Sequence, residues 1–272
     1  MIKSNFHTHT AFCDGLNTVE ELAGAAVALG MTSLGFSGHA YMPLEGIYGG
    51  MAPAVMIEYG RCVREVKEKY HGLINIFYGL ENDAAYMNPC DPYDYTIGSV
   101  HCIKCGGKFY PVDSTEDIVG RLVKDEFKGD GLAFAEAYFD TVVEFASTKQ
   151  ADILGHIDLV RRFNACGARF FDETDPRYLR AAEAALERAV SSDYLIEVST
   201  APLARGFSDE TYTSAHLLKH ARGLNARVIV NSDAHSAANL LFAFDKAEAA
   251  LREAGFTERW ELAPDGLIAV GV

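Results

Sequence analysis

Residues 2–9 read IKSNFHTH, a short run with the composition of a β-strand that ends in two histidines. His7 and His9 lie two positions apart, so their side chains share one face of an extended strand. Two imidazoles on one face can bind the same metal ion. This stretch therefore predicts a strand at residues 2–8 and the beginning of a metal site at its carboxyl end.

The same strand-like composition recurs along the chain, and longer segments of helical period separate the runs. The strand candidates occupy residues 2–8, 33–38, 74–80, 95–100, 153–155, 194–198 and 227–231. Amphipathic helix candidates occupy residues 19–29, 55–70, 132–148, 177–190, 209–224 and 238–254. Strands that alternate with helices predict repeated βα units and a parallel sheet.

Seven βα units in 272 residues favour an α/β fold, a TIM-like (β/α)7 barrel, over an open doubly wound sheet. The first strand is not followed by a G-x-G-x-x-G loop, which argues against a dinucleotide-binding sheet. The sequence contains no linker-like tract of proline, glycine or serine. We therefore expect a single domain over residues 1–272.

Residue types that bind metals follow six of the seven strand candidates. Beyond the first histidine pair they are His39, Glu81, His101, His156, Asp233 and His235. In barrels of this class the carboxyl ends of the strands build the active site, so these side chains are expected to converge.

Asp14 follows the first strand within the segment FCDG and either begins a turn or adds a ligand. With Asp14 the candidates are six histidines, two aspartates and one glutamate, enough for two or three divalent ions if Glu81 bridges. Imidazole together with carboxylate suits Zn, Mn or Fe better than Ca or Mg. We therefore expect transition-metal ions as cofactors.

Three arginines follow strands near these ligands and are candidates for binding a substrate phosphate. Arg161 and Arg162 come shortly after His156, and Arg205 comes after the sixth strand. A guanidinium matches phosphate oxygens with its planar fork, although pairing with Asp158 or Glu197 is the alternative role. We expect Arg161 and Arg205 to act directly on the substrate, and Arg162 to be a further phosphate-binding residue.

The bulk composition excludes several classes of function. A net charge of −14 argues against non-specific nucleic-acid binding, which depends on clustered Lys and Arg. No signal-peptide pattern and no apolar run long enough for a membrane helix are present, so we expect a cytoplasmic protein that does not contact membranes. The expected partner is a small-molecule phosphate ester, and the sequence carries no indication of oligomeric state.

The motifs resemble those of the polymerase and histidinol phosphatase (PHP) family of metal hydrolases. They are HTHT at residues 7–10, GH at 38–39, GLE at 79–81, GSVH at 98–101, GHID at 155–158 and NSDAHS at 231–236. The resemblance implies a distorted (β/α)7 barrel with a trinuclear metal centre. It implies one ion held by His7, His9, Glu81 and Asp233, a second by Glu81, His101 and His156, and a third by Asp14, His39 and His235.

Within the family, residues 95–101 and 155–163 are most similar to histidinol-phosphate phosphatases. This likeness implies hydrolysis of L-histidinol phosphate in histidine biosynthesis. We expect a metal-bridging hydroxide to attack phosphorus while Asp14 or His235 helps to protonate the leaving oxygen. The alternatives are a family phosphatase or phosphodiesterase acting on a nucleotide or phosphotyrosine peptide, an amidohydrolase-type deaminase, and a non-catalytic metal-binding module.

Overall fold

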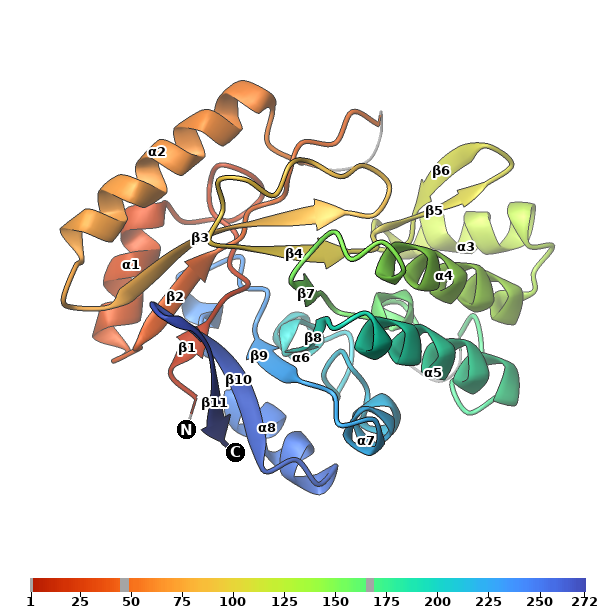
Figure 1. Ribbon diagram of the computed structural model, residues 1–272. Helices are drawn as coiled ribbons and strands as arrows, with labels where there is room; N and C mark the ends of the chain where they lie inside the picture. The colour runs from red at the N-terminus through yellow and green to blue at the C-terminus, as the bar shows by residue number, and fades with distance from the viewer. Residues whose placement is uncertain (1, 45–48, 165–168) are drawn as a thin grey trace.

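A computed structural model of the chain describes residues 2–44, 49–164 and 169–272. Seven strands form one parallel sheet in the order β1-β2-β3-β4-β7-β8-β9 (Figure 1). Their bounds are β1 Ser4–Asn5, β2 Ser33–Phe36, β3 Asn75–Asp83, β4 Tyr95–Ser99, β7 Ile153–Leu154, β8 Leu195–Ser199 and β9 Val228–Asn231. All seven overlap the strands expected from the sequence.

The sheet closes on itself just beyond the ends of β1 and β9. The amide of His9 donates to the carbonyl of Ala234 over 2.8 Å, and the amide of Ala234 donates to the carbonyl of His7 over 3.0 Å. One step earlier, the Asn231 side-chain oxygen accepts from the Phe6 amide at 2.8 Å. These bonds form a seam that completes a nearly closed seven-stranded barrel, so the predicted fold class is confirmed.

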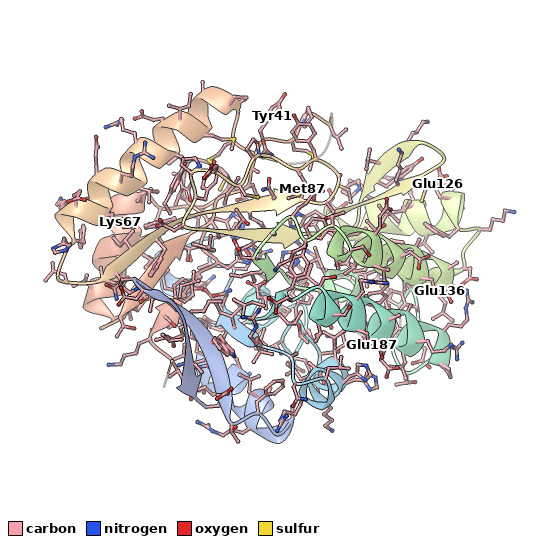
Figure 2. The ribbon with its side chains drawn as sticks, viewed as in Figure 1. Tyr41, Lys67, Met87, Glu126, Glu136 and Glu187 are labelled. Carbon is pink, nitrogen blue, oxygen red and sulfur yellow. The ribbon has the colours of Figure 1, made fainter. Side chains whose placement is uncertain are left out.

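Helices surround the barrel (Figure 1). The α-helices are α1 Val19–Ala28, α2 Pro53–Lys69, α3 Glu116–Glu126, α4 Gly131–Ala146, α5 Pro176–Ser191, α6 Ala201–Arg205, α7 Ala215–Gly223 and α8 Phe244–Glu253. Two short 3-10 turns are η1 Leu159–Arg161 and η2 Ala237–Asn239. Charged side chains such as Lys67, Glu136 and Glu187 lie on the outer helix faces, at least a third exposed (Figure 2). None of the helices in the described ranges has both the length and the apolar content that crossing a membrane requires.

The helix expected over residues 209–224 begins only at Ala215. The residues before it bond to the end of β8 instead, because Tyr212 and Ser199 exchange backbone hydrogen bonds of 3.0 and 2.8 Å. The Thr213 hydroxyl then donates to the Glu197 carbonyl at 2.8 Å. Contacts with the barrel thus replace the first turns of the expected helix.

Two antiparallel hairpins are additions that the strand pattern does not predict. The first, β5 Cys102–Cys105 with β6 Lys108–Pro111, starts directly after His101. It returns to the same place, since the Val112 amide donates to the His101 carbonyl over 2.8 Å. The second is β10 Glu258–Ala263 with β11 Gly266–Gly271.

The second hairpin covers the amino-terminal end of the barrel. Trp260 and Leu262 of β10 pack against an interior apolar cluster that includes Tyr95 and Leu195, the first residues of β4 and β8. Burial of this cluster stabilises the barrel from within. The opposite, carboxyl-terminal end is left for polar side chains.

Candidate metal centre

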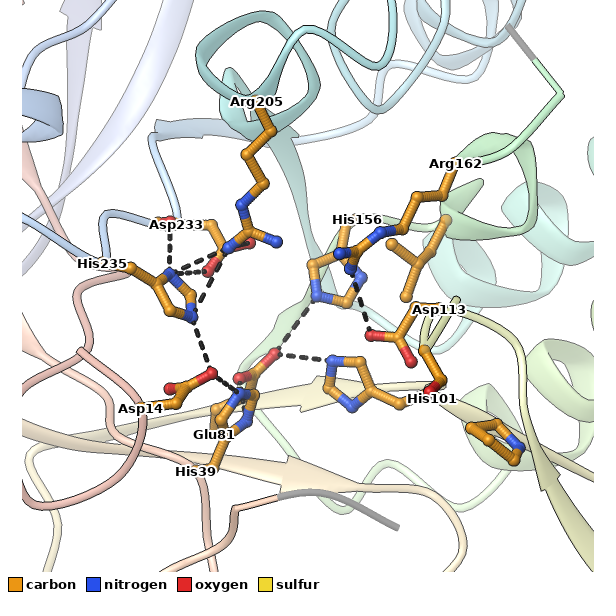
Figure 3. A pocket seen from close by; sticks show the side chains of 13 residues that line it. Asp14, His39, Glu81, His101, Asp113, His156, Arg162, Arg205, Asp233 and His235 are labelled. Atoms are coloured by element: carbon orange, nitrogen blue, oxygen red, sulfur yellow. Dashed lines mark hydrogen bonds and ion pairs between the residues drawn. The ribbon is translucent and has the colours of Figure 1, made fainter. Parts of the chain in front are cut away.

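The nine predicted ligands meet at the carboxyl end of the barrel. A cavity of about 480 Å³ opens there (Figure 3). Its lining includes Asp14, His39, Glu81, His101, His156, Asp233 and His235. His7 and His9 are completely buried and contact the lining carboxylates Glu81 and Asp233. His7 and His235 lie 228 positions apart in the sequence and therefore come together in one site, as expected for residues at strand ends of a barrel.

Glu81 lies at the centre of the cluster, near the end of β3. The distance from a Glu81 carboxylate oxygen to an imidazole nitrogen is 2.8 Å for His39, 3.2 Å for His156, 3.3 Å for His7, 3.4 Å for His101 and 3.5 Å for His9. The Ser99 hydroxyl donates to the same carboxylate at 2.6 Å. A carboxylate with imidazoles on both oxygens has the arrangement that a metal bridge requires.

The ligand atoms fall into four overlapping groups, each within 4.8 Å. The groups are His9–Asp14–His39–His235, His7–His9–Asp233, His7–Glu81–His156 and His39–Glu81–His101. All nine predicted ligands occur among them. The resemblance implies three groups, and the structure has four. His9 also joins Asp14, Glu81 is not in the group of His7, His9 and Asp233, and His7 instead of His101 joins Glu81 and His156.

Two buried ring nitrogens test whether a metal fits. Nε2 of His7 and Nε2 of His9 have no hydrogen-bond partner among the described residues. A buried polar atom without a partner lowers the stability of the folded state by about 1–3 kcal/mol. Nearby oxygens of Glu81 and Asp233 lie 3.1 to 3.7 Å away and bring negative charge. A divalent cation would satisfy the nitrogens and neutralise the carboxylates, so the residues present fit a metal centre.

Ionisation differs among the ligands. Burial opposes protonation of His7, His39 and His101, but the carboxylates around them raise the pKa of all three imidazoles, which must therefore release a proton to bind a metal. Burial, together with the neighbouring His235 and His39, lowers the pKa of His9 to about 3, which keeps this imidazole neutral and able to coordinate. Burial opposes ionisation of Glu81, but the surrounding histidines His7, His39 and His101 hold the pKa of its carboxyl well below the ordinary value. Neutral imidazole and ionised carboxylate are the forms that bind metals.

Glu197, in the middle of β8, contacts two of the histidines and orients the His7 ring. Its Oε1 lies 2.7 Å from Nδ1 of His7, and its Oε2 accepts the backbone amide of His156 at 2.9 Å. The Asn231 side chain donates to Oε1 at 2.9 Å. The contact between Glu197 and His7 Nδ1 directs His7 Nε2 toward Glu81. From the sequence, Glu197 is expected only as a partner for an arginine. Its position near the end of the strand expected at residues 194–198 was the available signal that it lies beside the metal ligands.

Asp83 performs the same role for His101. Its Oδ2 lies 2.9 Å from His101 Nδ1 and accepts the His101 amide at 3.0 Å. The sequence prediction does not include Asp83. The available signal is its spacing, since Asp83 lies two positions after Glu81 on β3 and therefore shares its face.

Backbone geometry positions the carboxylate of Asp233. Its φ of 49° lies in the left-handed region, which an aspartate adopts more readily than most residues. The turn brings Asp233 Oδ1 to 3.1 Å from His9 Nε2 and 3.4 Å from His235 Nδ1. The unusual backbone conformation of Asp233 therefore helps to place its carboxylate beside the two histidines.

The three candidate arginines do not share one environment. Arg205 lines the cavity, where its Nη2 lies 2.9 Å from His235 Nδ1 and 3.3 Å from Asp233 Oδ2 (Figure 3). Arg162 also lines the cavity, and its guanidinium lies 4.7 Å from the centre of the Phe207 ring. Both guanidinium groups therefore border the cavity.

Arg161 is turned away from the cavity. Its guanidinium donates to Asp158 at 3.1 Å, to Glu173 at 2.5 Å and to Glu210 at 3.4 Å. The prediction that Arg161 binds phosphate and acts in catalysis is therefore revised. Arg161 follows the alternative considered for it, pairing with Asp158, and Arg162 takes its place at the cavity.

Comparison with known proteins agrees with this architecture. The PHP domain family model matches residues 5–201. Histidinol-phosphatase of Bacillus subtilis (strain 168) is 24% identical over 268 residues, covering 90% of this chain and 98% of that protein. The crystal structure of the hisK protein of Listeria monocytogenes has a TM-score of 0.75 at 21% identity, covering 90% and 99% of the two chains. Histidinol phosphate phosphatase of Lactococcus lactis, complexed with zinc, L-histidinol and phosphate, has a TM-score of 0.74 at 20% identity, covering 98% of each.

Proposed function

The chain belongs to the PHP domain family, and we propose that it is a metal-dependent phosphomonoesterase that hydrolyses L-histidinol phosphate to L-histidinol and phosphate. The observation that carries the proposal is a cavity in which a cluster of histidines and carboxylates faces two arginines. The match over 98% of the length of a histidinol-phosphatase supports the choice of substrate. So does the fold shared with a phosphatase whose crystals hold zinc, L-histidinol and phosphate.

The cofactor is two or three ions of zinc, manganese or iron. The proposed ligands are His7, His9, Asp14, His39, Glu81, His101, His156, Asp233 and His235. When bound, the ions supply Lewis acidity, which polarises a phosphoryl oxygen and makes water a stronger acid. Glu81 would help to hold more than one ion, because five histidines surround its two oxygens.

Arg162 and Arg205 bind the phosphate of the substrate. Arg162 follows η1 directly and Arg205 is the last residue of α6, and the two reach the cavity on either side of His156 (Figure 3). A phosphate between them accepts hydrogen bonds from two guanidinium groups, each matched to its oxygens. The arginines also stabilise the charge that develops on the phosphoryl oxygens during transfer.

Asp14 and His235 contact the leaving group. They are the two most exposed members of the cluster, with side chains 41% and 22% exposed, and His235 Nε2 lies 3.1 Å from Asp14 Oδ2. A group at the cavity mouth meets the part of the ester that departs toward solvent. We assign protonation of the leaving oxygen to this pair.

The substrate assignment is tested by a kinetic comparison of L-histidinol phosphate with other phosphomonoesters, a phosphodiester, a nucleotide and a phosphotyrosine peptide. L-histidinol phosphate is expected to have the highest kcat/KM. A higher kcat/KM for another ester would contradict this assignment and indicate a PHP-family phosphatase or phosphodiesterase with a different substrate. Ammonia release from a nucleobase would instead indicate a deaminase.

The metal requirement is tested on the same preparation. Enzyme stripped with chelator is expected to lose turnover and to regain it with added zinc, manganese or iron. The His156→Ala variant should lose both bound metal and activity, whereas His71→Ala, an exposed histidine, should keep both. Full turnover by the stripped enzyme would contradict the proposal.

A further inference from the structure

One carboxylate in the cavity belongs to none of the candidate metal groups. Of the acidic residues that line it, Asp14, Glu81 and Asp233 are members of those groups, and Asp113 is not. Asp113 follows the β5–β6 hairpin, whose return to His101 through the Val112 amide holds it at the cavity wall (Figure 3). Its presence there calls for a separate explanation.

The contacts of Asp113 leave its carboxylate incompletely satisfied. Its side chain is only 13% exposed, and its Oδ1 is buried without a hydrogen-bond partner among the described residues. Oδ2 lies 3.6 Å from Nη1 of Arg162, beyond hydrogen-bond distance. Nε of Arg162 is buried and lacks a hydrogen-bond partner as well, within the part of the chain that the structure describes. The two opposite charges are therefore neighbours that do not satisfy one another.

A carboxylate in this position opposes the binding of a phosphate. Like charges in a partly buried cavity repel more strongly than they do in water. The repulsion is offset when the substrate itself carries a positive charge close to its phosphate. An ammonium group donates up to three hydrogen bonds, which an aspartate with an unpartnered oxygen can accept.

We propose that Asp113 binds the ammonium group of the substrate and makes the enzyme selective for aminoalkyl phosphates. This inference rests on the proposed phosphomonoesterase function and assigns a second contact to the same cavity. Arg162 binds the phosphate while Asp113, beside it, binds the amine, so the adjacent pair recognises two adjacent charges of opposite sign. The contact of 3.6 Å between Arg162 and Asp113 leaves each group able to bind its own part of the substrate.

The competing explanation is that Asp113 only positions Arg162. These two roles predict different kinetics. An ammonium-binding residue affects an amine-bearing ester and not its uncharged analogue, whereas a residue that positions the phosphate-binding arginine affects both esters equally. The decisive quantity is the ratio of the two kcat/KM values.

The test uses metal-loaded full-length enzyme and two esters that differ only at nitrogen, L-histidinol phosphate and its N-acetyl derivative. Phosphoethanolamine and ethyl phosphate provide a second, smaller pair. In Asp113→Asn, the ratio of kcat/KM for the amine to that for its uncharged match is expected to fall about 10- to 100-fold, the worth of one charged hydrogen bond. Asp113→Glu should recover part of the ratio, and Asp117→Asn, an exposed acid on α3, should not change it.

An unchanged ratio in Asp113→Asn, with both esters slowed equally or not at all, would overturn the inference and leave the phosphatase function intact. Metal content measured on each variant separates a loss of ligands from a loss of recognition. Failure of the wild-type enzyme to hydrolyse any of the four esters would instead overturn the proposed function itself.

Discussion

Glu197 shows how a single residue can govern the metal site without belonging to it. Glu197→Gln keeps the shape but removes the charge that holds His7 and accepts the His156 amide. Loss of such an orienting carboxylate costs about 10- to 100-fold in metal affinity or activity. We expect that decrease in zinc affinity, measured by competition with a chromophoric chelator.

The chain offers a matched control for this change. Glu187 also lies against a histidine, with its Oε1 2.9 Å from His220 Nε2, but this pair is on the surface between α5 and α7. Glu187→Gln should therefore leave the zinc affinity unchanged. An equal effect of both substitutions would show that the contact to His7 does not orient a ligand.

Arg161 and Arg162 are neighbours in sequence with opposite predicted roles. Arg161→Ala leaves the fully buried Asp158 without its positively charged partner, which costs about 3–5 kcal/mol for a broken buried pair. Arg162→Ala should preserve the free energy of unfolding and lower kcat/KM about 10- to 100-fold through loss of a charged phosphate contact. Urea unfolding and steady-state kinetics on both variants test whether Arg161 stabilises the fold and Arg162 binds phosphate. An Arg161→Ala enzyme that is stable but inactive would contradict this assignment.

At the scale of elements, the loop after β1 places Asp14 over the buried histidines. The Gly15 amide donates to the Thr10 carbonyl at 3.0 Å, and the Leu16 amide donates to the His235 carbonyl at 2.8 Å. A Cβ on Gly15 would lie 2.6 Å from the His9 carbonyl, closer than the backbone can allow. Only glycine fits at this point of the loop.

Gly15→Ala is therefore expected to displace Asp14 and lower the free energy of unfolding by about 1–3 kcal/mol, as overpacking does. Metal affinity should fall with it, as measured by chelator competition. Gly223→Ala provides the comparison, since no atom lies within 4 Å of its added Cβ, and its stability should change by less than about 0.5 kcal/mol. Equal stability of the two variants would argue against the close approach.

The barrel strands and the clustering of the nine candidate ligands were predictable because they depend on local pattern. Six of the seven strand candidates are followed by His, Glu or Asp, and strand ends converge in any barrel of this kind. The hairpins were not predictable, because their strands are only four to six residues long and lie outside the barrel sheet, so their pairing depends on tertiary contacts. Whether Arg161 or Arg162 faces the cavity depends on the geometry at the end of η1, because consecutive side chains point in different directions there.

At the scale of the whole molecule, the two ends of the barrel have different sources of stability. Apolar side chains and the β10–β11 hairpin close the amino-terminal end. At the carboxyl-terminal end, few backbone bonds join the segments after β1 and β9, between residues 7–9 and Ala234. His7 and His9 lie on one side of this seam, and Asp233 and His235 lie on the other. Metal ions bound by both sides would therefore connect the first strand to the last.

Metal removal should accordingly weaken the seam more than the rest of the barrel. A ligand present at 100 times its Kd adds about 2.7 kcal/mol to stability, which corresponds to roughly 5–10 °C in Tm for a chain of this size. We expect chelation to lower Tm by that amount and zinc to restore it. Hydrogen exchange should quicken at the amides of His9 and Ala234, which form the seam, while the amides between β3 and β4 stay protected. Uniform exchange across both regions would show that the metals stabilise the molecule without joining its two ends.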